Sequence, residues 1–106
     1  MEIKQELTKN DIKEGLVRVS GENISFFHGG KFRTKGHKLH ITLPDGRSCE
    51  TVITFSSKTG GPRFLKDIRG ALRAYFQKVY AKPGDILKIN CDEDSRFAIK
   101  YSSHQL

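Results

Sequence analysis

The chain lacks most of the residue patterns that mark a catalytic site or a membrane segment. It has no Trp, two Cys and three Pro, and no apolar run approaches the length of a membrane-spanning helix. A phosphate-binding loop with its following Lys is absent, because Thr59-Gly60-Gly61-Pro62 leads to Arg63 without the rest of that motif. The nucleophile elbow of the hydrolases is also absent. We therefore expect a chain with no membrane segment and no catalytic site of its own.

The His and acidic residues have the wrong spacing for a metal or nuclease site. His37 and His40 lie close together on an expected strand and face opposite sides, so they do not share a metal easily. A magnesium-dependent nuclease needs clustered carboxylates, and Asp45 followed by Glu50 lacks a Lys two residues after Glu50. The acidic run at 92–94 falls in an expected turn, where solvated charge is the ordinary role. We expect no metal and no cofactor.

The two cysteines, Cys49 and Cys91, are far apart and have no Cys or His neighbour at metal-ligand spacing. Nothing at the N-terminus resembles a signal peptide. We therefore expect both to be reduced, packed thiols of an intracellular protein. A disulfide between adjacent strands stays open as an alternative.

Positive charge is concentrated in the middle of the chain. The sequence carries 19 Lys and Arg against 12 Asp and Glu, a formal net charge of +7. Ten basic residues and three acids lie between Lys31 and Arg73, so the whole excess falls in this segment. A basic segment between neutral flanks indicates a polyanion partner. A solvated surface with a high isoelectric point is the alternative.

The clearest helix pattern is followed directly by a clear strand pattern. Lys82-Pro83-Gly84-Asp85 ends the helix, and Asp67 is expected near its start. Leu87 and Ile89 then alternate with polar residues, as in a half-buried strand. The helix is indicated by apolar residues at three- and four-residue spacing, which share one face: Leu65, Ile68, Leu72, Tyr75, Phe76 and Val79.

Shorter segments complete the outline of one domain spanning residues 1–106. Thr8-Lys9-Asn10-Asp11 has the spacing of a capping box, which predicts a short helix at about Lys9 to Glu14, ended by Gly15. Asp-Gly at 45–46 predicts a hairpin turn. We expect a mainly β fold with two short-to-medium helices and about seven short strands, forming an antiparallel barrel or strongly curved sheet. The expected strands are 2–7, 16–19, 24–27, 38–43, 47–56, 86–91 and 96–101.

Two segments resemble the DNA-binding pseudobarrel family. One is Leu7-Thr8-Lys9-Asn10-Asp11-Ile12, similar to the family's opening after its first strand. The other runs from Leu72-Arg73-Ala74-Tyr75-Phe76 through Ala81-Lys82-Pro83-Gly84-Asp85-Ile86-Leu87, similar to its helix, Gly-Asp turn and following strand. The family includes plant B-three transcription-factor domains and DNA-recognition domains of EcoRII-like restriction endonucleases. The absent Trp and the polar stretch at 28–36 favour the bacterial branch.

The resemblance implies a seven-stranded open β-barrel that grips the major groove of double-stranded DNA with two arms. The N-arm would lie at about Lys13 to Asn23, after the first helix. The C-arm would be the loop Ser56 to Arg63, which is also small, polar, basic and free of acids. Arg63 suits bidentate contact with guanine and Asn23 suits adenine, whereas the other polar side chains suit bases or phosphates. The predicted DNA-binding residues are Lys13, Arg18, Ser20, Asn23, Lys31, Arg33, Lys35, Ser56, Ser57, Lys58, Thr59 and Arg63.

We therefore expect the target-binding module of a bacterial type II restriction endonuclease, located in the cytoplasm, with a nuclease domain elsewhere in the full-length chain. A plant-type protein would instead be nuclear. One alternative is a small basic barrel that binds single-stranded nucleic acid by stacking bases on Phe26, Phe27 and Phe32. Another is a non-catalytic protein-interaction domain for an acidic partner. A standalone nuclease lacks its carboxylate cluster.

Overall fold

A computed structural model describes residues 2–28, 37–92 and 96–103. Seven strands and three helices lie within this part of the chain. In chain order they are β1 (Glu2–Glu6), α1 (Lys9–Glu14), α2 (Ile24–Phe27), β2 (Leu39–Thr42), β3 (Ser48–Thr51), β4 (Ile53–Phe55), β5 (Pro62–Leu65), α3 (Arg69–Lys78), β6 (Ile86–Cys91) and β7 (Arg96–Ser102).

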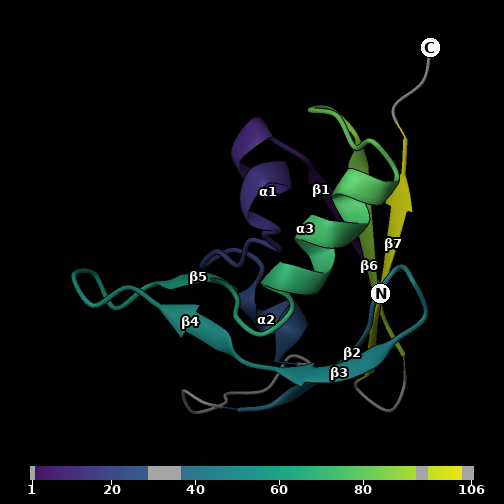
Figure 1. The fold of residues 1–106 in the computed structure, drawn as a ribbon. Coiled ribbons are helices and arrows are strands. Elements are labelled where there is room, and N and C mark those ends of the chain that lie inside the picture. Colours follow the sequence, from purple (N-terminus) through teal and green to yellow (C-terminus); the bar gives the residue numbers. More distant parts are fainter. Residues whose placement is uncertain (1, 29–36, 93–95, 104–106) are drawn as a thin grey trace.

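The strands form a five-stranded sheet in the order β1-β6-β7-β2-β3 and a separate two-stranded sheet of β4 and β5. The β4–β5 hairpin extends away from the five-stranded sheet (Figure 1). The mainly β fold is as predicted, but the larger sheet is mixed, because β7 pairs in parallel with β2. The β6–β7 hairpin inserts between β1 and β2, and this brings two strands of the same direction together.

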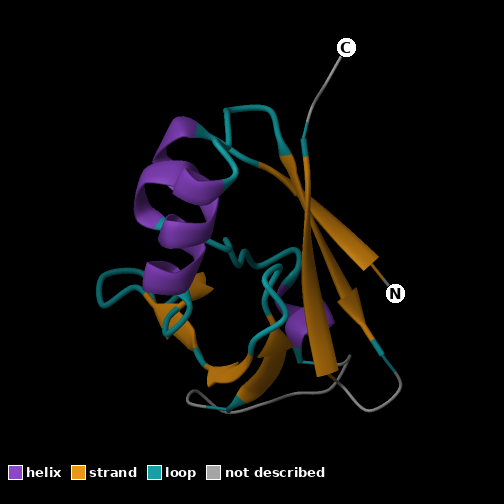
Figure 2. Ribbon diagram, turned by 45° about the vertical axis from the view of Figure 1, so that its right-hand side comes forward, coloured by secondary structure: helices purple, strands orange, loops and turns teal. Residues whose placement is uncertain are grey.

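The apolar side of the five-stranded sheet packs against α3. Leu72 and Phe76 of α3 are fully buried, as are Leu87 and Ile89 of β6. Helices α1 and α3 lie on the same side of this sheet (Figure 2). The predicted apolar stripe of the helix therefore faces the core.

The first helix follows the prediction closely. The Asp11 N–H donates to Thr8 Oγ1 at 3.2 Å, and the Thr8 N–H donates to Asp11 Oδ2 at 2.9 Å. This is the expected capping box. Gly15 ends the helix with φ +70°, a left-handed conformation that L side chains rarely adopt. A Cβ on Gly15 would lie 2.1 Å from the Arg69 carbonyl oxygen, so α1 ends in close contact with α3.

The predicted strand at 24–27 is wrong, because this segment is helix α2. Phe26 and Phe27 are both buried. Consecutive strand residues point to opposite faces, whereas one helical turn can direct both rings inward. Both rings pack against Phe97, with centroids 5.5 and 5.7 Å away.

Three other predicted boundaries differ in the structure. The expected strand at 47–56 is divided into β3 and β4 at Val52, whose carbonyl accepts from the Lys66 N–H at 2.9 Å. Leu65 belongs to strand β5, and α3 begins only at Arg69, so Asp67 lies before the helix. The segment 16–19 forms one isolated bridge in place of a full strand.

The two cysteines are free and lie at opposite ends of one row of paired residues. Cys91 pairs with Phe97, Phe97 with Ile41, and Ile41 with Cys49. Two strands therefore separate the thiols, which is too far for the alternative of a disulfide.

Candidate nucleic-acid interface

The two predicted arms lie side by side. The Val19 N–H donates to the Arg63 carbonyl at 2.8 Å, and the Leu65 N–H donates to the Val17 carbonyl at 3.0 Å. These bonds add the N-arm segment to the β4–β5 sheet as an antiparallel neighbour of β5. Because the pairing is antiparallel, the chain after Val19 continues toward the end of the sheet that carries the C-arm loop.

The C-arm is the tip of a β-hairpin. The Ser56 hydroxyl accepts from the N–H groups of Lys58 and Thr59 at 3.2 and 3.3 Å, and the Thr59 hydroxyl accepts from the Gly61 N–H at 3.2 Å. Two of the predicted contact hydroxyls therefore shape the loop, while Ser57 and Lys58 are exposed at its tip.

Arg63 lies in β5, a strand that the sequence patterns did not predict. Pro62 and Arg63 continue the hairpin before the chain reaches α3. The exposed Arg63 side chain is thereby held on a paired strand.

The N-arm turn is built from two of its own predicted contact residues. Asn23 Oδ1 accepts from the Ser20 N–H at 2.7 Å, and the Asn23 N–H donates to Ser20 Oγ at 3.3 Å. Asn23 Nδ2 also donates to the Arg18 carbonyl at 3.5 Å. The Asn23 amide is thus turned toward its own loop. Lys13, the first polar residue of this arm, is exposed in the last turn of α1.

A buried glutamine that the sequence did not single out supports the N-arm. The Gln5 side chain donates to the Leu16 carbonyl at 3.0 Å and accepts from the Arg18 N–H at 2.9 Å. Gln5 is buried at an inward position of β1, on the same face as Ile3. A polar side chain at an inward strand position was the available signal, because it requires partners when buried.

Three arginines from different segments adjoin Phe64, two through their guanidinium groups and one through its backbone, and we call this group the arginine cluster. Arg18 of the N-arm is paired with Phe64 across the isolated bridge. The Cζ atoms of Arg63 and Arg69 lie over the Phe64 ring, 5.1 and 4.8 Å from its centroid. These distances are typical of cation–π contacts. No sequence pattern singled out Phe64, and residue spacing carried no sign of this contact.

Carboxylates neutralise two of the three arginines. Arg18 Nε lies 3.2 Å from Asp11 Oδ2, and Arg69 Nη2 lies 2.9 Å from Glu14 Oε2. Arg63 has no carboxylate partner in the described part of the chain, and it is exposed. It is therefore the cation of the cluster that is available to an external anion.

The structure does not place every predicted contact residue. Lys31, Arg33 and Lys35 lie outside the described residues. The remaining nine lie in the two arms or at the end of α1, and those of the arms are brought together by the pairing of the N-arm with β5.

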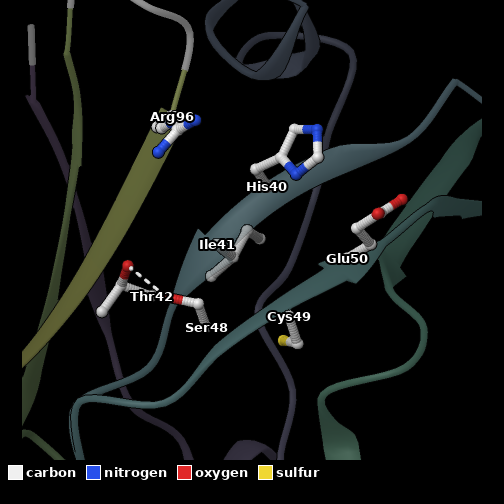
Figure 3. Close-up of a pocket in the computed structure, with 7 residues that line it drawn as sticks. All are labelled: His40, Ile41, Thr42, Ser48, Cys49, Glu50 and Arg96. Carbon is white, nitrogen blue, oxygen red and sulfur yellow. Dashed lines mark hydrogen bonds between the residues drawn. The ribbon is translucent and has the colours of Figure 1, made fainter.

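A hollow of about 390 Å³ lies elsewhere, over β2, β3 and the start of β7 (Figure 3). None of the nine predicted contact residues that the structure describes lines it. His40 pairs with Glu50, and Ile41 with Cys49, so His40 and Cys49 lie on opposite faces of the sheet. Burial raises the pKa of the Cys49 thiol, which disfavours a nucleophilic thiolate. These residues do not form a Cys–His pair.

The described residues contain no group of three or more His, Cys, Asp or Glu side chains placed to hold a metal ion. No helix among them is long and apolar enough to cross a membrane.

No protein-family model and no curated protein matches this sequence. Solved structures do match. The N-terminal domain of Helicobacter pylori LlaJI.R1 aligns with a TM-score of 0.69 at 8% identity, over 96% of this chain and 87% of that one. An Arabidopsis FUS3–DNA complex gives 0.65 at 13% identity, over 97% of each chain. The Arabidopsis thaliana protein At1g16640.1 gives 0.60 at 11% identity, over 100% and 93%.

These alignments cover nearly the whole chain, and they confirm the predicted resemblance to the DNA-binding pseudobarrels at the level of the fold. The two arms singled out from the sequence are therefore loops of a fold that the chain shares with these proteins.

Proposed function

We propose that this chain is a sequence-specific double-stranded DNA-binding domain whose two arms enter the major groove. The observation that carries the proposal is the joined pair of arms with exposed, unneutralised Arg63 between them. An arginine fork matches the paired acceptors of guanine in the major groove. The neighbour solved in complex with DNA supports the same partner.

Residues at different places in the two arms make different contacts with DNA. Arg63 contacts a base, because its strand holds it close to the N-arm. Ser57 and Lys58 at the hairpin tip, with Lys13 on α1, contact phosphates or the outer edges of bases. Ser56 and Thr59 keep the loop in shape. Asn23 contacts adenine only if its amide leaves the bonds that it makes within the N-arm turn.

We also propose that the chain is a single target-binding module, without its own catalytic site, of a bacterial restriction endonuclease. The similarity to the N-terminal domain of LlaJI.R1 supports this context. A cytoplasmic location and a nuclease domain in the full-length protein follow from the same proposal. A plant-type role in the nucleus is the alternative that the FUS3 similarity supports.

The single-stranded alternative loses two of its three stacking platforms. Phe26 and Phe27 are 7% and 1% exposed and pack in the core, so neither ring is open to a base. The third candidate, Phe32, lies outside the described residues. A protein-interaction domain for an acidic partner stays as a second candidate, because the exposed basic side chains would suit such a partner as well.

The test is a comparison of affinities. The protein is first used to select a preferred sequence from a randomised duplex library, and its affinity is then measured for that duplex, single-base variants and the separate strands. We expect tighter binding to the preferred duplex than to either strand. Arg63→Ala should lose about 1–3 kcal/mol of binding free energy and relax specificity at one base pair. Lys58→Ala should instead weaken binding to all duplexes alike. Equal binding of all sequences would exclude specific recognition.

A further inference from the structure

Phe64 is the residue at which the two arms and α3 meet. Its backbone is fixed from the β4 side, because the Phe64 N–H donates to Thr54 Oγ1 at 3.3 Å and Thr54 Oγ1 donates to the Phe64 carbonyl at 3.1 Å. On the other side it is paired with Arg18 of the N-arm. The half-buried ring therefore has a fixed place beside Arg63 and Arg69.

Two cations near one ring repel each other, and an ion pair between Arg69 and Glu14 reduces this repulsion. Arg69 Nη2 is bound to Glu14 Oε2 at 2.9 Å, and Arg69 Nε donates to the Glu14 carbonyl at 3.3 Å. The Glu14 carboxylate offsets the charge of Arg69. The ring can then hold Arg69 as a fixed neighbour and still attract Arg63, which carries the remaining charge.

A guanidinium that packs its flat face on an aromatic ring keeps its N–H donors free, because these lie in the guanidinium plane. We infer that Phe64 is a positioning residue that holds Arg63 with its hydrogen-bonding edge directed at a base. This inference rests on the proposed function, and it explains how a long, exposed side chain selects one base pair. It also assigns Glu14 and Arg69 to the same task, since they set the charge around the ring.

The experiment compares Phe64→Leu, which removes the π face, with Phe64→Tyr, which keeps it. Discrimination is the affinity for the preferred duplex divided by that for the duplex changed at the base pair relaxed by Arg63→Ala. Phe64→Leu should reduce this ratio about two- to fivefold, the size of a cation–π contact at an exposed site. Phe64→Tyr should keep the wild-type ratio. In an Arg63→Ala background, Phe64→Leu should cause no further loss of discrimination.

A second pair of variants leaves the ring untouched and so avoids a folding defect in β5. Glu14→Gln removes the carboxylate that neutralises Arg69, and we expect a smaller loss of discrimination at the same base pair. Glu2→Gln is its control, because Glu2 is an exposed acid of β1 outside both arms and the change in charge is identical; it should keep full discrimination.

The outcomes separate the inference from the proposed function. If the wild-type protein selects a sequence but Phe64→Leu and Glu14→Gln keep full discrimination, the positioning role is wrong and the proposed function stands. An equal loss of affinity for every duplex in Phe64→Leu would also overturn it, since Arg63 would then be held for a phosphate. If the wild-type protein selects no sequence, the proposed function and the positioning role of Phe64 are both wrong.

Discussion

At the scale of single residues, Gly15 lies where the N-arm leaves α1 and passes against α3. Two separate constraints require glycine here. Its φ is +70°, and a Cβ would lie 2.1 Å from the backbone carbonyl oxygen of Arg69. Backbone cannot move aside as the end of a flexible side chain can. The start of the N-arm is therefore fixed by a close contact between two backbones.

Gly15→Ala should lower the free energy of unfolding by about 2–5 kcal/mol, from left-handed strain together with overpacking. Gly60→Ala is a matched control, because Gly60 has φ +73° and no atom within 4 Å of its Cβ position. It should cost only the strain, about 1–2 kcal/mol. Urea unfolding of both variants measures the difference. Equal costs would mean that α1 and α3 are not in such close contact.

Tyr101 is a second residue with a measurable role. Its hydroxyl donates to the Asp85 carboxyl group, which also accepts from the Lys82 N–H at 2.8 Å. Asp85 is buried, and its backbone carbonyl accepts from the Leu7 N–H at 2.7 Å. The Gly-Asp turn predicted from the sequence is thus tied to both β1 and β7.

Burial and the hydrogen bond to Asp85 raise the pKa of Tyr101 to about 12. Because the folded pKa is above the ordinary value near 10, the stabilisation is complete below pH ~10 and is lost as pH rises through about 12. Tyr101→Phe should lower the free energy of unfolding by about 1–3 kcal/mol at neutral pH. Between pH ~10 and about 12 it should lose less further stability than the wild type. Thermal melts against pH measure both.

Tyr80→Phe is the control for that variant, because its side chain is 83% exposed. We expect its stability to equal that of the wild type at neutral pH. If Tyr101→Phe is equally neutral, the bond to Asp85 does not stabilise the fold.

At the scale of elements, the C-arm hairpin is shaped by the Ser56 hydroxyl, which accepts from two backbone N–H groups. Ser56→Ala removes the acceptor for two N–H groups, so it should cost about 0.5–1.5 kcal/mol and speed amide hydrogen exchange at Lys58 and Thr59. Ser57→Ala changes the next residue, which is exposed, and should leave both quantities unchanged. Hydrogen exchange followed by NMR gives the result for each amide. Unchanged exchange in Ser56→Ala would show that the loop keeps its shape without that hydroxyl.

The elements also show where sequence patterns were sufficient. Helix α1 was predicted to the residue, because its capping box and Gly15 are local signals. Strand β6 was predicted equally well, because its alternation is clean and a turn precedes it. In both cases the residues that decide the structure are neighbours in sequence.

Prediction failed where tertiary contacts decide the structure. Leu65 fits the apolar spacing of the following helix, yet it lies in β5, because its N–H pairs with the distant Val17 carbonyl. Phe26 and Phe27 have strong strand preference, but packing both rings on Phe97 requires a helical turn. The C-arm was predicted from its composition and the N-arm from the resemblance to the pseudobarrel family. Their pairing could not be predicted, since residues far apart in sequence make it.

At the scale of the whole molecule, charge is arranged on two sides. The arms carry the basic residues described above. The outer face of the five-stranded sheet carries a separate group, because Lys88 and Lys100 lie directly opposite each other on β6 and β7. Leu87 and Ile89, the strand neighbours of Lys88, are buried, so both lysines point away from the core and from α3. Total charge and the charge of the interface can therefore be varied separately.

Binding through phosphate contacts should weaken steeply with salt, because each contact releases counterions and contributes about 0.9 to the slope of log K against log salt. We propose that Lys31, Arg33 and Lys35 contact phosphates. Replacing all three with Gln should reduce the slope by up to ~2.7 and leave base preference nearly intact. The matched control replaces Lys78 in the last turn of α3, Lys88 and Lys100 with Gln, which removes the same charge from positions outside both arms. Its slope should stay close to that of the wild type, because charges beyond a Debye length of about 10 Å are largely screened. If both triple variants flatten the slope equally, total charge governs the salt dependence and the segment at 31–35 does not touch the DNA backbone.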